Sequence, residues 1–216
     1  MNCLPQAIEM TDRKLLLLIN GANNPWLDQF MWTISQTTTW IPFYLLCVWL
    51  LWLCYKKECL RPLVFITFAI ILANSISSDI IKPLVQRPRP THTPELLDAL
   101  HLHLKSNGHF YYGGQYGFLS SHAANTSVIA ILMFYMTIPY HSKQLFLGIF
   151  LTFYTLIVCY SRVYLCAHYP SDIMGGLLLG IAIAILTLFI FTKYQNWCSN
   201  NSYLCRTEKK TKKTRI

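Results

Sequence analysis

Long apolar segments separated by short polar ones dominate the pattern along this chain. Five of them approach the roughly 20 apolar residues that one helix needs to cross the hydrocarbon core of a bilayer. They lie at residues 40–55, 62–81, 119–138, 144–161 and 173–192. The third begins with the polar stretch SSHAANTS and is the least obvious of the five. The pattern predicts an all-α fold, namely a polytopic integral membrane helical bundle of about five transmembrane helices.

The N-terminal region has a weaker pattern. In residues 11–35 the apolar positions are interrupted by NGANNP and by Asp28. This favours one or two amphipathic helices that lie in the membrane interface, with a poor sixth span as the alternative. We interpret residues 1–216 as one domain. Its parts are amphipathic N-terminal helices (1–39), a transmembrane core that holds the candidate chemistry (40–192) and a basic cytoplasmic tail (193–216).

Composition agrees with a membrane protein and excludes several other classes. The chain is 54% hydrophobic and only 12% charged, whereas about a quarter of the residues in soluble domains are charged. The eight cysteines form no CxxC pair, which argues against a zinc site or a disulfide scaffold. His101 and His103 have no cysteine or carboxylate at firm ligand spacing, so we interpret them as surface histidines.

The charges predict an orientation. Seven of the 18 Lys and Arg residues lie between Lys193 and Arg215, and others lie between the predicted spans, at Lys56, Lys57, Arg61 and Lys143. Five spans place all of these on one side, which should be the cytoplasm. A basic tail can bind nucleic acid or anionic lipid. After a membrane helix, however, a cytoplasmic anchor is the simpler interpretation, and we expect no nucleic-acid partner.

The opposite side receives three polar stretches, KPLVQRPRP (82–90), FLSSHAANT (118–126) and SRVYLCAHYPSD (161–172). Their cations Lys82, Arg89 and Arg162 run against the positive-inside trend, which suggests a function. Together they can surround one phosphate, since Arg offers a planar fork and Lys a point charge. The backbone N–H groups of Ser120 and Ser121, at a helix start, also suit an anion.

Two histidines and one acid complete a set that can cleave a phosphate ester. One histidine can attack phosphorus, and the other can protonate the departing oxygen. If residues 168–172 form a helical turn, Asp172 and His168 lie on one face, and the carboxylate can fix the imidazole orientation. His122 is the second histidine.

Each residue also has a simpler interpretation. Lys82 can pair with Asp79 at a helix end, and a lone His122 can form a hydrogen bond within the bundle. Asp172 can cap the last span. Arg89 and Arg162 can extend toward the interface as long amphipathic side chains. All five must coincide, in the right order, for the simpler interpretation to hold.

The three stretches resemble the signature motifs of the type 2 phosphatidic acid phosphatase family. Lys82, six residues and then Arg89-Pro90 is similar to the first motif. LSSH resembles the second, which is usually Pro-Ser-Gly-His, so that Leu119 replaces Pro and Ser121 replaces Gly. The third motif is matched by Ser161-Arg162, followed after five residues by His168 and after three more by Asp172. The resemblance covers about residues 40–192 and is greatest for the bacterial branch that includes lipid A phosphatases and undecaprenyl diphosphate phosphatases.

The resemblance implies a role for each matched residue. His168 would be the nucleophile that forms a phosphohistidine, Asp172 would orient it, and His122 would be the general acid. The phosphate would be held by Lys82, Arg89 and Arg162, with help from Ser120 and Ser121. The family needs neither a metal nor another cofactor for this chemistry.

The resemblance also implies a lipid substrate. We expect a phosphorylated membrane lipid, cleaved at the periplasmic face of a bacterial inner membrane, with lipid A (its 1- or 4′-phosphate) as the first choice. Undecaprenyl diphosphate and then phosphatidylglycerophosphate are the alternatives, and a non-catalytic lipid or anion transporter is an alternative of another class. Two interpretations remain for Arg87, which lies outside the motifs. It contacts a second phosphate or headgroup, or it faces solvent.

Overall fold

The computed structural model describes residues 5–138 and 144–213, and it describes their side chains except those of Gln144 and residues 202–213. The all-α prediction is confirmed, since the described residues contain no β-strand. The helices are α1 (Gln6–Gly21), α2 (Pro25–Ser35), α3 (Ile41–Tyr55), α4 (Leu60–Ser75), α5 (Lys82–Val85), α6 (Pro94–Leu97), α7 (Ser121–Thr137), α8 (Gln144–Tyr164) and α9 (Pro170–Lys213). A π-helical segment, Ile76–Ile81, joins α4 to α5 without a break.

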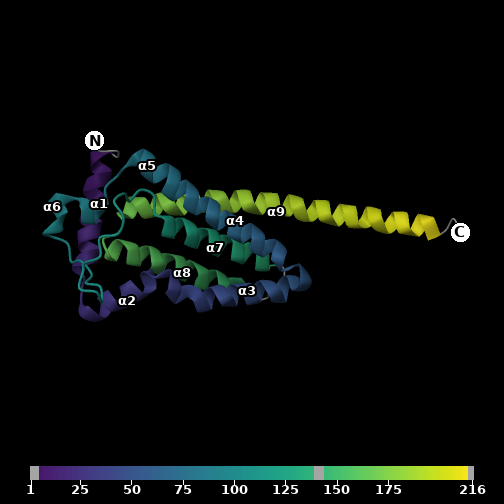
Figure 1. Cartoon of the computed structure of the whole chain (residues 1–216), viewed down its shortest axis with the longest axis horizontal. Coiled ribbons are helices and arrows are strands. Elements are labelled where there is room, and N and C mark those ends of the chain that lie inside the picture. Colours follow the sequence, from purple (N-terminus) through teal and green to yellow (C-terminus); the bar gives the residue numbers. More distant parts are fainter. Residues whose placement is uncertain (1–4, 139–143, 214–216) are drawn as a thin grey trace.

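Four of the five predicted spans are long and apolar enough to cross a membrane, and in Figure 1 they run lengthwise along the bundle at differing tilts. Their bounds are Thr37–Glu58, Leu60–Val85, Leu145–Tyr164 and Pro170–Asn201. The remaining predicted span, residues 119–138, corresponds to α7, which has 17 residues and packs against α4, α8 and α9. Val128 and Leu132 of α7 are fully buried. Because protein surrounds α7, its polar beginning need not face lipid.

Glycines let α9 approach α7 closely. A Cβ at Gly176 would lie 2.4 Å from the carbonyl oxygen of Ser120, and one at Gly180 would lie 2.4 Å from that of Ala124. Real side chains do not tolerate such distances, so only glycine permits this helix contact. The contact brings the start of α9, which carries Asp172, beside the start of α7, which carries Ser121 and His122.

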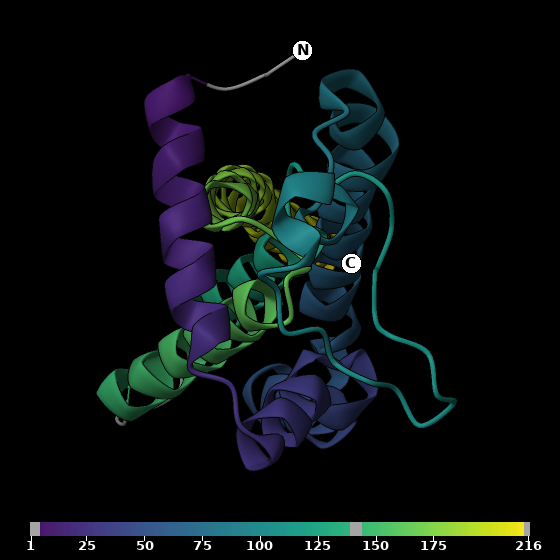
Figure 2. The ribbon, with the colours of Figure 1, turned by 90° about the vertical axis from the view of Figure 1, so that its left-hand side faces the viewer.

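The N-terminal region forms two helices, α1 and α2, and neither is among the candidate spans. Helix α1 crosses one end of the bundle at a steep angle to the long helices (Figures 1 and 2). Its buried positions are Asp12, Leu16 and Asn20, which are four residues apart and therefore share one face. Asn20 donates to the carbonyl oxygens of His101 and Tyr164, both at 2.9 Å, and so anchors α1 to the bundle.

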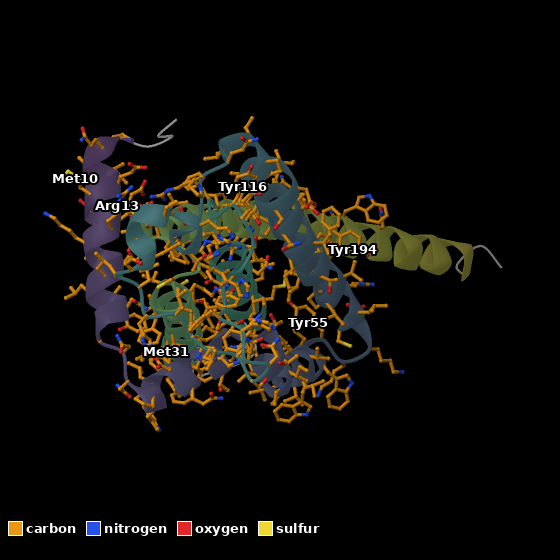
Figure 3. The ribbon with its side chains drawn as sticks, turned by 60° about the vertical axis from the view of Figure 1, so that its left-hand side comes forward. Met10, Arg13, Met31, Tyr55, Tyr116 and Tyr194 are labelled. Carbon is orange, nitrogen blue, oxygen red and sulfur yellow. The ribbon has the colours of Figure 1, made fainter. Side chains whose placement is uncertain are left out.

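The two ends of the bundle differ. One end carries α1, α5 and α6, and the connection between α3 and α4, with Lys56 and Lys57, lies at the other (Figure 1). Figure 3 shows the same separation, with Arg13 and Tyr116 toward one end and Tyr194 toward the other. Lys143, part of the predicted basic side, lies outside the described residues, as do the side chains of the tail cations after residue 201.

Candidate active site

The first motif meets the second through Lys82. The helix that begins as α4 continues through the π-helical segment, and Lys82 lies where this segment gives way to α5. The Lys82 ammonium donates to the Ser121 hydroxyl at 2.8 Å. Ser77 and Ser78 contact the same hydroxyl, at 2.7 and 3.0 Å. The alternative pairing of Lys82 with Asp79 is not formed, because the ammonium points inward to Ser121 instead.

The second motif is joined to the third by Ser120. Its side chain caps the start of α7 by accepting from the Ala123 N–H, and its own N–H donates to the carbonyl oxygen of Asp172 at 3.0 Å. Ser120 thus holds two motifs together, and its N–H group is already occupied. Of the two serines predicted to contact phosphate, Ser121 is the one that faces Lys82.

Arg89 and Arg162 are 9% and 5% exposed, so they are not side chains that extend to the interface. Neutral oxygens hold both of them. Arg89 Nε donates to the Tyr116 carbonyl oxygen at 3.1 Å, and Arg162 donates to the hydroxyls of Ser35 and Tyr111. Arg162 Nε is buried and has no hydrogen-bond partner among the described groups, which leaves a donor that an anion can use. Burial lowers the pKa of Arg89, and repulsion from Arg162 adds to this effect.

His168 and Asp172 lie close together, although His168 precedes α9 and residues 168–172 do not form a complete helical turn. His168 Nδ1 is 3.7 Å from Asp172 Oδ2, and the two side chains are 1% and 0% exposed. Burial lowers the pKa of His168 to about 4, against the opposing effect of Asp172. The imidazole is therefore neutral near pH 7, which is the form that can act as a nucleophile. Since Nδ1 faces the carboxylate, Nε2 is the nitrogen available for attack.

Asp172 also caps α9, so the simpler interpretation of this residue is correct as well. Its Oδ2 accepts from the Tyr169 N–H at 2.9 Å, immediately before the helix begins at Pro170. An acid in the first turn that accepts this N–H is one half of a capping box. The cap holds the carboxylate in place beside His168.

His122 lies in the first turn of α7, where Lys82, Arg89, Arg162 and His168 all exert an electrostatic effect on its ring. No hydrogen bond to its side chain is formed within the described part of the chain, so the simpler interpretation of His122 as a bundle contact is not supported. The structure thus brings together all the predicted residues from three separate motifs: Lys82, Arg89, Ser120, Ser121, His122, Arg162, His168 and Asp172.

Comparison with known protein families identifies the family to which this chain belongs. The family model described as the PAP2 superfamily matches residues 60–196, which is more than half of the chain. The chain belongs to the PAP2 superfamily. The resemblance seen in the three motifs is therefore confirmed, and the protein is a phosphatase embedded in a membrane.

Two relatives are lipid A 4′-phosphatases. The chain is 30% identical to the one from Porphyromonas gingivalis over 80% of this chain and 69% of the relative. It is 32% identical to the one from Bacteroides thetaiotaomicron over 78% of this chain and 72% of the relative.

Two solved PAP2 structures resemble the fold. A phosphatidylglycerolphosphate phosphatase from Bacillus subtilis aligns over 88% of both chains with a TM-score of 0.64 and 21% identity. LpxE from Aquifex aeolicus aligns over 81% of this chain and 93% of its own, with a TM-score of 0.54 and 25% identity.

The sequence interpretation of Arg87 as a solvent-facing residue is wrong. Its guanidinium is buried and lies 2.6 Å from Asp172 Oδ1 and 2.6 Å from Asp12 Oδ2. Burial opposes the charged form, but Asp172 and Asp12 outweigh it and raise the pKa of Arg87. Arg87 is only 5% exposed, and two carboxylates of the chain itself pair with it. This link from α1 to the PAP2 third motif was not predicted.

The tyrosine- and glycine-rich stretch YYGGQYG (111–117) forms a wall of the site. The Arg89 N–H donates to the Gln115 carbonyl oxygen at 3.1 Å, and the Gly117 N–H donates to that of Arg87 at 2.8 Å. Gly113 has φ +68°, and a Cβ there would lie 2.4 Å from Arg89 Nη1. Glycine therefore allows this loop to lie directly on Arg89.

His101 and His103 hold a loop against α2. His101 Nε2 is 2.8 Å from Asp28 Oδ2, and the His103 ring stacks on Trp32 with centroids 4.5 Å apart. Among the described residues no group of three or more His, Cys, Asp and Glu is placed to hold a metal ion.

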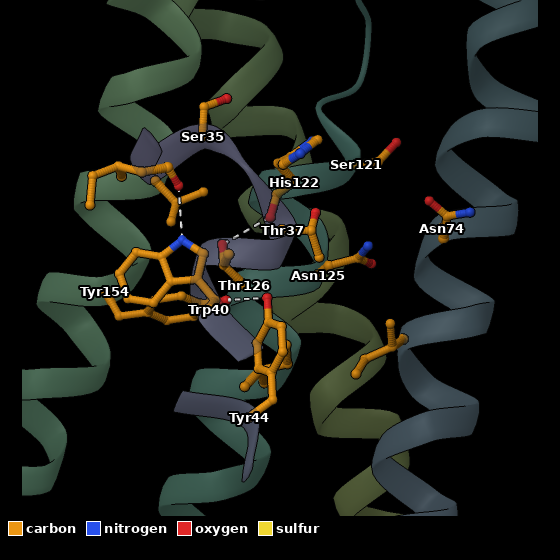
Figure 4. A pocket seen from close by; sticks show the side chains of 14 residues that line it. Ser35, Thr37, Trp40, Tyr44, Asn74, Ser121, His122, Asn125, Thr126 and Tyr154 are labelled. Carbon is orange, nitrogen blue, oxygen red and sulfur yellow. Dashed lines mark hydrogen bonds between the residues drawn. The ribbon is translucent and has the colours of Figure 1, made fainter. Parts of the chain in front are cut away.

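A cavity of about 350 Å³ begins at Ser121 and His122 and continues into the bundle (Figure 4). Its deeper wall is formed by Ile129, Tyr154 and Val158, and the hydroxyls of Tyr44 and Tyr154 are 3.3 Å apart. The cavity thus connects the polar site at the end of the bundle with an apolar interior.

Proposed function

We propose that this protein removes the 4′-phosphate of lipid A at the periplasmic face of a bacterial inner membrane, through a phosphohistidine intermediate. The observation that carries the proposal is the set of three cations Lys82, Arg89 and Arg162. Within the described part of the chain, no carboxylate lies within 4.0 Å of any of them. Arg89 and Arg162 are buried and Lys82 is half-buried, and such cations without a counter-ion favour an anion. The three non-bridging oxygens of a phosphate monoester match the three cations.

In the first step, the lone pair of His168 Nε2 forms a bond to phosphorus. The bond from phosphorus to the lipid oxygen breaks, its electron pair stays on that oxygen, and His122 gives it a proton. Asp172 stabilises the positive charge that develops on the imidazole. Lys82, Arg89 and Arg162 stabilise the negative charge on the phosphoryl oxygens.

In the second step, His122 takes a proton from water as the water oxygen attacks phosphorus. The bond between phosphorus and His168 breaks, inorganic phosphate leaves, and both histidines return to their starting forms. These cations supply the charge stabilisation that Mg²⁺ supplies in many phosphoryl-transfer enzymes. The mechanism therefore requires no metal.

Lipid A is favoured over other substrates by the two relatives, which are lipid A 4′-phosphatases at 30% and 32% identity. The orientation follows from charge, since the end with Lys56 and Lys57 should be cytoplasmic. Undecaprenyl diphosphate and then phosphatidylglycerophosphate are the next candidates. A transporter would not need the His168–Asp172 pair beside a second histidine.

The first test is phosphate release by the purified protein from lipid A and from undecaprenyl diphosphate, with a chelator present. We expect faster release from lipid A and no release from either by His168→Ala. Full activity in His168→Ala would refute the covalent mechanism, and loss of activity in the chelator, with rescue by a divalent metal, would refute a metal-free one. The matched control is His109→Ala, because His109 is an exposed histidine in the same polar face.

A further inference from the structure

The lining of the cavity below the site includes a residue with a buried side-chain oxygen that has no hydrogen-bond partner in the described part of the chain. Asn125 lies one helical turn after His122 on α7, and its Oδ1 is buried without a hydrogen-bond partner among the described groups. Nearly all buried polar atoms in native structures have a partner, so such an atom needs an explanation. The residue itself lines the cavity, so a rotation of its carboxamide brings Oδ1 to the cavity, where a ligand can supply the missing donor.

The position of Asn125 relates it to the scissile phosphate. His122, Asn125 and Ile129 are spaced three and four residues apart, so they form one stripe along α7 that lines the cavity. With a rise of about 1.5 Å per residue, Asn125 lies about 4.5 Å and Ile129 about 10 Å deeper than His122. A lipid whose phosphate is held at Lys82 and Ser121 therefore places the next few atoms of its body beside Asn125.

The other walls of the cavity determine what can occupy it. Trp40 and Tyr154 line one side, and Asn74 of α4 lines the opposite side (Figure 4). Ile70, Ile129 and Val158 make the lining largely apolar. Thr126 also lines it, but its hydroxyl already donates to the His122 carbonyl oxygen at 2.9 Å. The cavity thus suits an acyl chain that carries one polar group close to its phosphate end.

We infer that Asn125 selects substrates whose acyl chain bears an amide or hydroxyl group near the phosphate. Such a group contains both a donor and an acceptor, so it satisfies the Asn125 carboxamide in either orientation of its oxygen and nitrogen. An ester or a polyprenyl chain has no donor and leaves Oδ1 unsatisfied. The inference rests on the proposed function, because lipid A carries amide and hydroxyl groups on its acyl chains.

The test compares lipid A with phosphatidic acid, whose chains are joined by esters alone, in mixed micelles with the purified full chain. The measured quantity is the ratio of kcat/KM for lipid A to kcat/KM for phosphatidic acid. We expect Asn125→Leu to lower this ratio about tenfold, since the variant removes the Oδ1 acceptor, which only the substrate with a donor can use. Asn125→Ala, which adds no bulk, should lower the ratio similarly. It replaces Asn125→Leu in the test if that variant does not fold.

Thr126→Val is the matched control, because it removes a hydroxyl from the same cavity that is already satisfied within α7. Its ratio should stay within about twofold of the wild-type ratio. If both Asn125 variants keep the wild-type ratio, the inference is overturned, while the proposed function stands on the activity with lipid A. If the wild-type protein releases no phosphate from lipid A, the proposed function fails, and the inference fails with it.

Discussion

Arg87 and the three cations Lys82, Arg89 and Arg162 lie at the same end of the bundle, yet their surroundings are opposite. Arg87 has two carboxylates, each at 2.6 Å. The other three have hydroxyl and carbonyl oxygens, such as Ser121 for Lys82 and the Tyr116 carbonyl for Arg89. Neutral oxygens fix the direction of a cation without cancelling its charge. The charge of Arg87 is thus balanced within the chain, whereas the other three charges remain available to an anion.

The difference separates two tasks that the sequence presents as one basic cluster. A buried charge that has its partners contributes to a unique structure, and removing one member leaves the others uncompensated. Buried charges of like sign that lack partners repel one another, and they persist where binding or catalysis needs them. Arg87 should therefore matter most for stability, and Lys82 should matter most for turnover.

The largest effect on stability is expected for Arg87→Met. The variant leaves Asp12 and Asp172 buried without a counter-ion, which costs about 3–5 kcal/mol of unfolding free energy. SDS-induced unfolding in mixed micelles measures it. Asp12→Asn should cost less, since Arg87 keeps Asp172. The double variant should lose less unfolding free energy than the two single variants together, because both substitutions act on one ion-pair network.

The Asp12→Asn variant also tests whether α1 positions the Asp172 carboxylate for the proposed reaction. Asp12 is on α1 and accepts from Ser171 as well as from Arg87, so we expect a lower kcat with KM nearly unchanged. Asp12→Glu should restore part of the kcat. An unchanged kcat in an Asp12→Asn protein of lowered stability would show that the link is structural only.

The next largest effect is expected for the activity of Lys82→Met. Lys82→Met removes one of the charges that stabilise the phosphoryl oxygens, so kcat/KM should fall about 10²- to 10³-fold. The unfolding free energy should stay the same or rise, since Lys82 experiences repulsion from Arg89 and Arg162. Lys14→Met is the control, because it removes the same charge from an exposed position of α1. A strongly destabilised Lys82→Met protein would show that Lys82 and Arg87 do not differ as proposed.

The fold and most of the site were predictable because their signals are local. Apolar runs identify the spans, and three short motifs contain Lys82, His122 and His168. The Arg87–Asp12 pair joins residues 75 positions apart, and no local spacing links them. One signal was present nevertheless. Asp12, Leu16 and Asn20 share a face of α1, which places two polar residues on the stripe that packs against the bundle.

Other parts of the site depend on helix packing and were not predictable from local patterns. The role of Ser120 in joining two motifs requires α7 and α9 to approach closely, and that approach depends on Gly176. The unpartnered Asn125 oxygen is recognisable only once the cavity is formed. Sequence patterns therefore predicted which residues gather at the candidate site, but not which neighbours fix or neutralise them.

The smallest expected effect is a shift in the pKa of the His168 ring, which tests the electrostatic balance around this residue. Burial lowers the pKa of this ring to about 4, so lowering the pH through 6.5 should leave it neutral and able to attack. Histidine-labelled NMR of the ligand-free protein in micelles measures this, and the signal absent from His168→Ala assigns the ring. Below about pH 4 the ring gains a proton and loses the lone pair on Nε2. A His168 signal that titrates near 6.5 would mean that Asp172 stabilises the charged ring despite its ion pair with Arg87. In that case the carboxylate would be shared with His168 rather than held by Arg87.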